Sequence, residues 1–258
     1  MPSGVLGQKV AIPEHYDPSV LFGIARTDHG RSFYGCDLWR AYEVSWLAPS
    51  GCPQIAILEL EVPAHSPRLV ESKSLKLYLG SLNNVVVESH SALCSRITED
   101  LTPVLGVQPQ VRVIDALPPV CLPGICIDDA SPTITPSGKV DGRILRIDSQ
   151  QCAQETLHSR VLRSLCPVTG QPDWAAVIVQ YTGALITHES LLRYIVGFRQ
   201  HHGFHEACVE RIFCDIMDYC KPEMLSVMAC FTRRGGIDIN PWRSTHDLTV
   251  PMWRDERQ

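Results

Sequence analysis

Alternating and helical hydrophobic patterns divide the chain into two similar series of elements. In the first series, the pattern over residues 41–47 and 54–62 predicts two strands, and Pro49–Pro53 between them has the composition of a hairpin loop. The pattern then predicts a helix over 84–101 and a strand over 110–114. An order of hairpin, helix and strand is typical of a mixed α+β unit.

The second series repeats this order. Strands are predicted over residues 156–165 and 175–181, with a short Pro/Gly segment between them. Thr187 is the expected N-cap of one helix, and a second helix is predicted over 205–220 before a closing strand over 225–232. We therefore predict an α+β fold that contains a duplicated module.

Residues 115–143, between the two series, contain five prolines and three glycines without sustained periodicity. This composition is typical of a linker or an irregular insertion. The sequence therefore predicts three parts, which are an N-terminal module over 1–114, a linker over 115–143 and a C-terminal module over 144–258.

The 258 residues are 45% hydrophobic and 20% charged, and their formal net charge is -5. This balance is ordinary for a globular protein and gives no attraction to nucleic acid or anionic membranes. No run approaches the roughly 18 consecutive apolar residues of a membrane span, and the first residues lack the apolar core of a signal peptide. We expect a cytoplasmic protein with no membrane contact and no direct nucleic-acid partner.

Eleven cysteines is a high and odd number. None forms a Cys-x-x-Cys pair, which removes the commonest zinc and redox signatures. Cys208, Cys214 and Cys220 recur at a spacing that turns each side chain by roughly 120° around a helix, so they cannot share one metal ion. We expect reduced, mostly buried thiols and no metal site.

One cysteine differs from the others in its setting. It begins the stretch Cys166-Pro-Val-Thr-Gly-Gln-Pro-Asp173-Trp174, where prolines and glycine favour an exposed turn. A thiol can add to an electrophilic carbon, and a nearby carboxyl group can transfer protons. A structural cysteine and a turn aspartate are the alternative interpretation. Because an aspartate of ordinary pKa, about 3.9, is ionised at neutral pH, a donor role for Asp173 requires burial or a neighbouring charge.

Further candidates lie at the start of the helix predicted over 205–220. Glu206 could accept two parallel hydrogen bonds from the N–H edge of a guanine-like ring, or could be an acidic residue favoured at a helix N-terminus. His201, His202 and His205 also suggest a zinc site. No cysteine or carboxylate pair lies at the matching ligand spacing, so that suggestion is weak.

Two basic segments could bind an anion. In Arg233-Arg234-Gly235-Gly236, guanidinium groups can hold a phosphate and glycine permits close backbone approach, although a charged turn has the same composition. Lys73 and Lys76 could serve the same anion or line the solvated face of a strand. The chain has neither a Gly-x-Gly-x-x-Gly turn nor a Walker loop, so a nicotinamide cofactor would need an unrelated scaffold.

Four segments together resemble one enzyme family, and they read VESKSLKLYLGSLN, CPVTGQPDW, FHEACVERIF and TRRGGIDINPWRS. They are similar to segments of the NADPH-dependent 7-cyano-7-deazaguanine reductases, the nitrile-reducing enzymes of queuosine biosynthesis, in their long two-module class. The resemblance extends from Leu6 to Arg243. It implies tandem tunnelling-fold modules of ββααββ topology that form part of an oligomeric β-barrel, with a homodimer as the expected assembly.

The resemblance also assigns roles by position. Cys166 would add to the nitrile carbon and form a covalent thioimide, Asp173 would donate protons, and His205 would assist Asp173. The residues expected to hold the deazapurine are Val70, Glu71, Ser72, His205 and Glu206, and those expected to contact NADPH are Ser72, Lys73, Arg234 and Gly235. Reduction of a nitrile to a primary amine takes four electrons, so each turnover would consume two NADPH.

Three other functions share some of these features. A GTP-cyclohydrolase-like zinc hydrolase would need a Cys/His metal set that the sequence does not display. A cysteine hydrolase that converts a nitrile to an amide or acid would act without NADPH and would leave Lys73 and Arg234 unexplained. A non-catalytic purine-binding module would not depend on Cys166.

Overall fold

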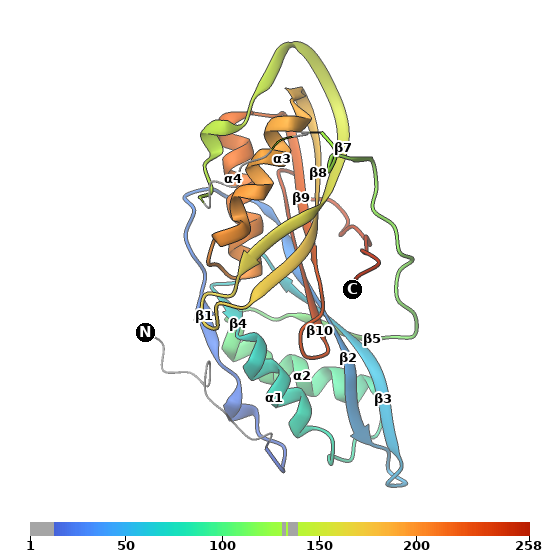
Figure 1. Ribbon diagram of the computed structural model, residues 1–258. Coiled ribbons are helices and arrows are strands. Elements are labelled where there is room, and N and C mark those ends of the chain that lie inside the picture. The colour runs from blue at the N-terminus through green and yellow to red at the C-terminus, as the bar shows by residue number, and fades with distance from the viewer. Residues whose placement is uncertain (1–12, 131–132, 134–138) are drawn as a thin grey trace. The chain divides into compact units, whose positions relative to one another are not determined.

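The computed structural model describes residues 13–130, 133 and 139–258, so Leu6 and part of the predicted linker lie outside the described residues. The chain has a mixed α+β fold with two compact units, each made of segments that are far apart in the sequence (Figure 1). The first unit contains Met1–Thr27, Asp37–Leu117 and Arg233–Asp238, and the second contains Asp28–Cys36, Pro118–Thr232 and Ile239–Gln258.

The first unit combines two helices with antiparallel strands. Its elements are η1 (Pro18–Val20), β1 (Gly23–Ala25), β2 (Tyr34–Leu47), β3 (Pro53–Pro63), β4 (Arg68–Val70), α1 (Ser72–Ser81), α2 (His90–Leu105) and β5 (Gln110–Ile114), and the first three residues of β2 belong to the second unit. Strand β3 lies between β2 and β5, and β1 pairs with β4 as a separate two-stranded ribbon. The predicted hairpin and the strand over 110–114 are confirmed, although β2 begins seven residues earlier than predicted, at Tyr34 rather than at Ala41.

The helix predicted over 84–101 is wrong at its start. Helix α2 begins only at His90, because the Ser89 side chain accepts a hydrogen bond from the backbone N–H of Ala92 and caps the first turn. It continues to Leu105 and ends at Gly106, whose φ of 77° is the left-handed conformation common at helix C-termini. Leucine and isoleucine at every fourth position bury one stripe of this helix, at Leu93, Ile97, Leu101 and Leu105.

The segment with Lys73 and Lys76 is helical, so a strand face there is a wrong interpretation. The alternation of leucine with polar residues over 75–79 resembles a strand, but Glu71 caps the N-terminus of α1. Leu75, Tyr78 and Leu79 then lie at helical spacing and are buried. Local capping therefore decides the structure of this short apolar run.

The second unit contains the longer strands. Its elements are β6 (Ile125–Cys126), η2 (Gly142–Ile144), β7 (Ile147–Leu165), β8 (Pro172–Ile186), α3 (His188–Val196), η3 (Gly197–Gln200), α4 (His205–Tyr219), β9 (Met224–Phe231) and β10 (Ile237–Ser244), whose first two residues belong to the first unit. The strand order is β10-β9-β8-β7-β6, antiparallel except for the β6–β7 pair. Helices α3 and α4 lie along one side of this sheet (Figure 1).

The predicted elements of the second series are confirmed in type. Strands β7 and β8 include the predicted strands but are much longer, and α4 and β9 match their predicted ranges within a residue or so. Thr187 is the N-cap of α3 as predicted, although its side chain makes no capping bond and instead donates to Ser190 Oγ at 2.8 Å.

Strand β10 was not predicted. Its sequence alternates apolar and polar residues and contains a proline, which is unusual inside a strand. Asp238, Asn240 and Arg243 are all fully buried, so polar side chains that normally indicate a loop here lie in the interior. Buried polar side chains need hydrogen-bond partners, and the partner of Arg243 is Glu210, which is far away in the sequence. The sequence of the strand alone does not show that such partners exist.

The cysteines differ from expectation in their burial. All eleven are free thiols, as expected, but only five are buried, so the prediction of mostly buried thiols is wrong. The exposed thiols lie at a hairpin tip, in the 115–143 segment and at the far end of β7, namely Cys52, Cys121, Cys126 and Cys152. None of the helices in the described part of the chain is both long and apolar enough to cross a membrane.

Glu59 is expected to be a determinant of stability in the first unit. Its carboxylate is 1% exposed and accepts from Arg40 Nε at 2.9 Å and from Arg112 Nε at 2.8 Å. Glu59→Ala would leave the fully buried Arg40 cation unpaired, so we expect denaturant unfolding to show a loss of about 3–5 kcal/mol. Glu61→Ala, two positions along β3 and partly exposed, is the matched control, and an equal loss there would contradict the role of the ion pair.

Candidate functional site

Cys166 begins the short connection between the longest strands of the second unit. The connection runs from Cys166 to Gln171 and is closed by backbone hydrogen bonds. The N–H of Cys166 donates to the carbonyl of Gln171 at 2.9 Å, and the N–H of Gly170 donates to the carbonyl of Cys166 at 3.0 Å. Gly170 has a φ of 67°, a conformation that residues with a side chain rarely adopt. The half-buried thiol is therefore held at the end of a rigid hairpin.

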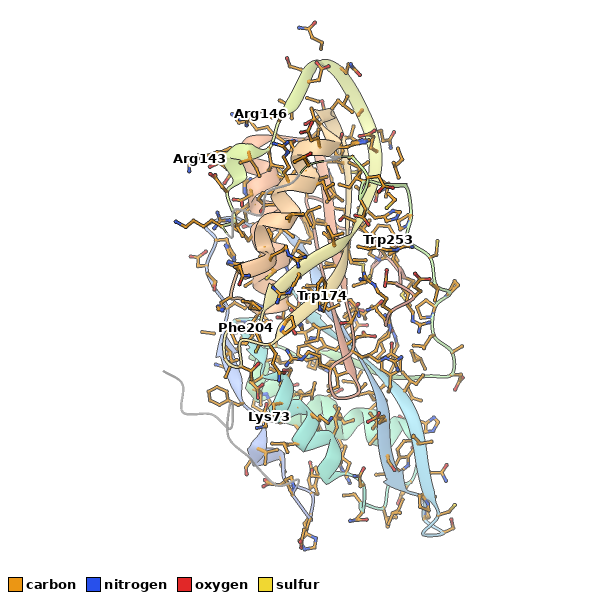
Figure 2. The ribbon with its side chains drawn as sticks, viewed as in Figure 1. Lys73, Arg143, Arg146, Trp174, Phe204 and Trp253 are labelled. Atoms are coloured by element: carbon orange, nitrogen blue, oxygen red, sulfur yellow. The ribbon has the colours of Figure 1, made fainter. Side chains whose placement is uncertain are left out.

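Asp173 lies at the start of β8, directly opposite Ser164 of β7. Its side chain is 4% exposed, so the burial required for a donor role is present. Side chains alternate along a strand, so Asp173 points to the same face as Ala175, which belongs to the core under the helices. The carboxyl group thus faces the helix layer, while its neighbour Trp174 is partly exposed (Figure 2).

The start of α4 is fixed to the hairpin by backbone pairing. The N–H of Leu165 donates to the carbonyl of His201 at 2.8 Å, and the N–H of Gly203 donates to the carbonyl of Leu165 at 3.1 Å. Phe204 follows as the N-cap of α4 (Figure 2). This pairing places the first turn of α4 beside the residue that precedes Cys166.

The His205 imidazole contacts two side chains of the sheet. Its Nε2 lies 3.5 Å from Oδ2 of Asp173, and its ring stacks on the ring of Phe231 with centroids 3.9 Å apart and planes 28° apart. The imidazole is 14% exposed. His205 and Asp173 therefore lie together, and Phe231 is a further neighbour of the imidazole whose sequence position indicates only a strand.

Glu206 and Cys208 occupy the same first turn of α4. Glu206 is 3% exposed, so its carboxylate lies in a largely dry environment. Burial raises the pKa of the Cys208 thiol to about 12, a hydrogen bond with Ser164 opposes the rise, and the nearby carboxyl groups of Glu206, Asp173 and Glu210 add to it. Cys208 is therefore a neutral thiol at physiological pH, and these carboxyl groups are close enough to influence it.

In the first unit, four of the predicted site residues are consecutive. Val70 ends β4, Glu71 is the N-cap of α1, and Ser72 and Lys73 form its first turn. The carboxylate of Glu71 accepts from the backbone N–H of Lys73 at 2.8 Å and from that of Ser74 at 2.7 Å. Glu71 is 2% exposed, whereas Lys73, near the start of α1, is only partly buried (Figure 2).

The loop with Arg234 and Gly235 forms a tight turn in the same unit. The N–H of Arg234 donates to the carbonyl of Ile237 at 2.9 Å, and Gly235 has a φ of 62°. A Cβ atom at Gly235 would lie 2.6 Å from Nζ of Lys76, so the absence of a side chain lets the loop approach this ammonium group. Beside them is a cavity of about 140 Å³ whose lining includes Glu43, Lys76 and Gly235.

These residues fit a phosphate-bearing cofactor. Lys73, Lys76 and Arg234 supply positive charge, and Gly235 leaves room that a Cβ atom would fill. Lys76, a candidate for anion binding in the sequence, is close to Gly235. The described residues contain no group of three or more His, Cys, Asp and Glu side chains placed to hold a metal ion.

The sequence matches known proteins over most of its length. Residues 12–113 match a family described as nitrile reductase, 7-cyano-7-deazaguanine-reductase N-terminal, and residues 172–249 match the QueF-like proteins. The chain is 45% identical to a protein of Stenotrophomonas maltophilia (strain R551-3) named NADPH-dependent 7-cyano-7-deazaguanine reductase, and the match covers 98% of this chain and 97% of the relative. A protein of the same name from strain K279a is 44% identical with the same coverage.

Proposed function

The chain belongs to the NADPH-dependent 7-cyano-7-deazaguanine reductase family, and on this basis we propose that it reduces the nitrile of 7-cyano-7-deazaguanine to 7-aminomethyl-7-deazaguanine through a covalent adduct on Cys166. The reaction belongs to queuosine biosynthesis. The observation that carries the mechanism is the hairpin end of the second unit, where a thiol is held close in sequence to a buried carboxyl group that contacts an imidazole. A thiol nucleophile beside a proton donor suits addition to a nitrile.

Cys166 forms the first bond. The thiol gives up its proton to the site as the sulfur adds to the nitrile carbon, and the π electron pair moves to the nitrogen, which takes one proton. The proton lost and the proton gained balance, so the product is a thioimide with the combined mass of the thiol and the nitrile. The backbone hydrogen bonds of the hairpin hold the thiol in position for this attack.

Asp173 supplies the proton, and His205 holds the carboxyl group in place. The 4% exposure of Asp173 keeps bulk water from competing for the proton. Because Nε2 of His205 lies 3.5 Å from Oδ2 of Asp173, the imidazole can orient the carboxyl group and return a proton to it between steps.

NADPH is the cofactor of the family, and two molecules in succession would each supply one hydride ion. Between the two transfers the carbon–sulfur bond breaks, which returns the Cys166 thiol and lets the product leave as the amine. Ser72, Lys73, Arg234 and Gly235 are the residues proposed to hold it. Lys73 and Arg234 neutralise phosphate charge, Ser72 offers a hydroxyl group at the exposed start of α1, and Gly235 allows close backbone approach.

The residues proposed to contact the deazapurine, by the family resemblance, are Val70, Glu71, Ser72, His205 and Glu206. A buried carboxylate such as that of Glu206 can accept two parallel hydrogen bonds from the N–H edge of a guanine-like ring. Glu71 already accepts two backbone N–H groups, so its remaining lone pairs would serve the ligand.

The proposal also covers the modules of the chain, its assembly and its location in the cell. We propose that residues 1–114 and 144–258 are tunnelling-fold modules joined by the 115–143 linker, and that they form part of a β-barrel in a homodimer. The order β7, β8, α3, α4, β9, β10 supports a ββααββ module. The eleven free thiols support the cytoplasm, where reducing conditions preserve them.

The test is to mix the purified protein with 7-cyano-7-deazaguanine and NADPH, and to follow nicotinamide absorbance together with product mass. We expect two NADPH oxidised for each 7-aminomethyl product. An amide or acid formed without NADPH oxidation would instead show a nitrile hydrolase, and tight binding without any turnover would show a purine-binding module. Activity that requires bound zinc would indicate a cyclohydrolase-like enzyme.

A further inference from the structure

We infer that Phe231 is a positioning residue for His205, holding the imidazole against the Asp173 carboxyl group, and that the Gln258 amide fixes Phe231 in this position. The inference rests on the proposed role of His205 in the reaction. It assigns a function to two residues, Phe231 in the core and Gln258, to which the resemblance gives no role.

The first support is the geometry of the stack. The rings of His205 and Phe231 are nearly parallel, with a 3.9 Å centroid separation that leaves no room for a solvent layer between them. Phe231 is fully buried at the end of β9, so its own ring cannot turn away toward solvent. One face of the imidazole is therefore fixed by an immobile surface.

The second support is the position of Phe231 relative to Asp173. Phe231 is paired with Ala175, which is two residues beyond Asp173 on β8. Residues two apart on a strand point to the same face, so Phe231 and Asp173 are diagonal neighbours below α4. The imidazole that lies on Phe231 has its Nε2 atom 3.5 Å from Oδ2 of Asp173, so one ring makes both contacts.

The third support is the clamp on the backbone of Phe231. Nε2 of Gln258 donates to the carbonyl of Phe231 at 3.0 Å and to Oδ1 of Asn240 at 2.6 Å. Its Oε1 accepts from the backbone N–H of Asp255 at 3.1 Å, so both N–H groups and the oxygen of the buried amide are engaged. Gln258 thus ties the last residue of β9 to β10 and holds Phe231 in register.

The consequence for the reaction follows from the sensitivity of proton transfer to geometry. A general acid contributes only when it lies within hydrogen-bond reach of its partner, and displacement by ~1 Å can cost about a hundredfold in rate. Without the stack, the imidazole can rotate about its side-chain bonds and lose its contact with Asp173. Phe231 is enclosed in the core and does not itself reach the substrate. His205 is also proposed to contact the deazapurine, so a displaced imidazole should weaken substrate binding as well as proton transfer.

The test compares Phe231→Leu with Phe213→Leu. Phe213 is equally buried but packs edge-on against Phe33 at 5.8 Å, away from His205. We expect both variants to lose similar stability in denaturant unfolding, and only Phe231→Leu to lower kcat, by about ten- to a hundredfold, with a smaller rise in KM for the nitrile. Gln258→Ala removes the hydrogen bond to the Phe231 carbonyl but keeps the Phe231 ring, so we expect it to lower kcat by a smaller factor than Phe231→Leu.

A spectroscopic measurement tests the stack itself. In the wild-type protein, the ring current of Phe231 should shift the NMR resonances of the His205 ring protons upfield, and Phe231→Leu should abolish this shift while Phe213→Leu keeps it. Equal losses of kcat in the two variants, or His205 resonances that do not respond to Phe231→Leu, would overturn the inference. A wild-type protein without NADPH-dependent turnover would overturn the proposed function instead, and the ring-current shift would still decide whether Phe231 holds His205.

Discussion

Cys166→Ala is expected to stop NADPH oxidation, with a loss of at least ~10³-fold in kcat, because the variant cannot form the covalent bond that prepares the nitrile for reduction. The variant should also fail to form the covalent adduct with the nitrile. Wild-type protein incubated with 7-cyano-7-deazaguanine in the absence of NADPH should gain the mass of one whole substrate molecule, since addition of a thiol to a nitrile releases no atoms. The variant should gain none.

Cys152→Ala is the matched control for this experiment. Cys152 lies on the same strand, β7, but at the end remote from the hairpin, and its thiol is exposed. This variant should keep both the adduct and the turnover. Persistent adduct formation in Cys166→Ala, or its loss in Cys152→Ala, would show that another thiol is the nucleophile.

Asp173→Asn is expected to lower kcat by about 10²–10⁴-fold, the range that a positioned proton donor contributes. Asparagine has nearly the shape of aspartate but cannot deliver a carboxyl proton, so the fold should persist while proton transfer to the nitrogen is lost. Adduct formation measured by mass should slow along with NADPH oxidation, because the first addition already requires a proton.

Asp215→Asn separates this effect from the general loss of a buried carboxylate. Asp215 is 6% exposed on α4 and accepts from the Tyr194 hydroxyl and from Arg211 Nε, each at 2.7 Å. Its replacement should lower stability in thermal unfolding and leave kcat nearly unchanged. If Asp173→Asn turned over normally, or if both variants lost kcat equally, Asp173 would not be the donor.

The elements of the fold were predictable where one physical signal dominated. Strand β5 and helix α4 have clear periodicity and sharp ends, and both were predicted within a residue or so. Helix α1 was misread because its apolar residues are compatible with either period, and the capping carboxylate of Glu71 decides the outcome. Strand β10 was missed because its buried polar side chains are stabilised by partners far away in the sequence.

The candidate site was predictable as a set of residues but not as an arrangement. Cys166 and Asp173 share one short segment, so a hairpin that carries both follows from the sequence. The contact between His205 and Asp173 depends on the pairing of Leu165 with the residues before α4, which no local pattern indicates. Phe231 carries no sequence signal at all, since an aromatic residue ending a strand is ordinary core composition.

The hairpin between β7 and β8 also bears on the order of folding. Joining the ends of these strands requires closure of only the Cys166–Gln171 loop, and closure of a short loop costs little conformational entropy. Hairpins form in about 1–10 μs, whereas pairing with the distant β9 must first overcome a larger entropic cost. We therefore expect the hairpin that carries Cys166 and Asp173 to form first, as a local event. The His205 imidazole and the Phe231 ring would then pack against a hairpin that is already formed.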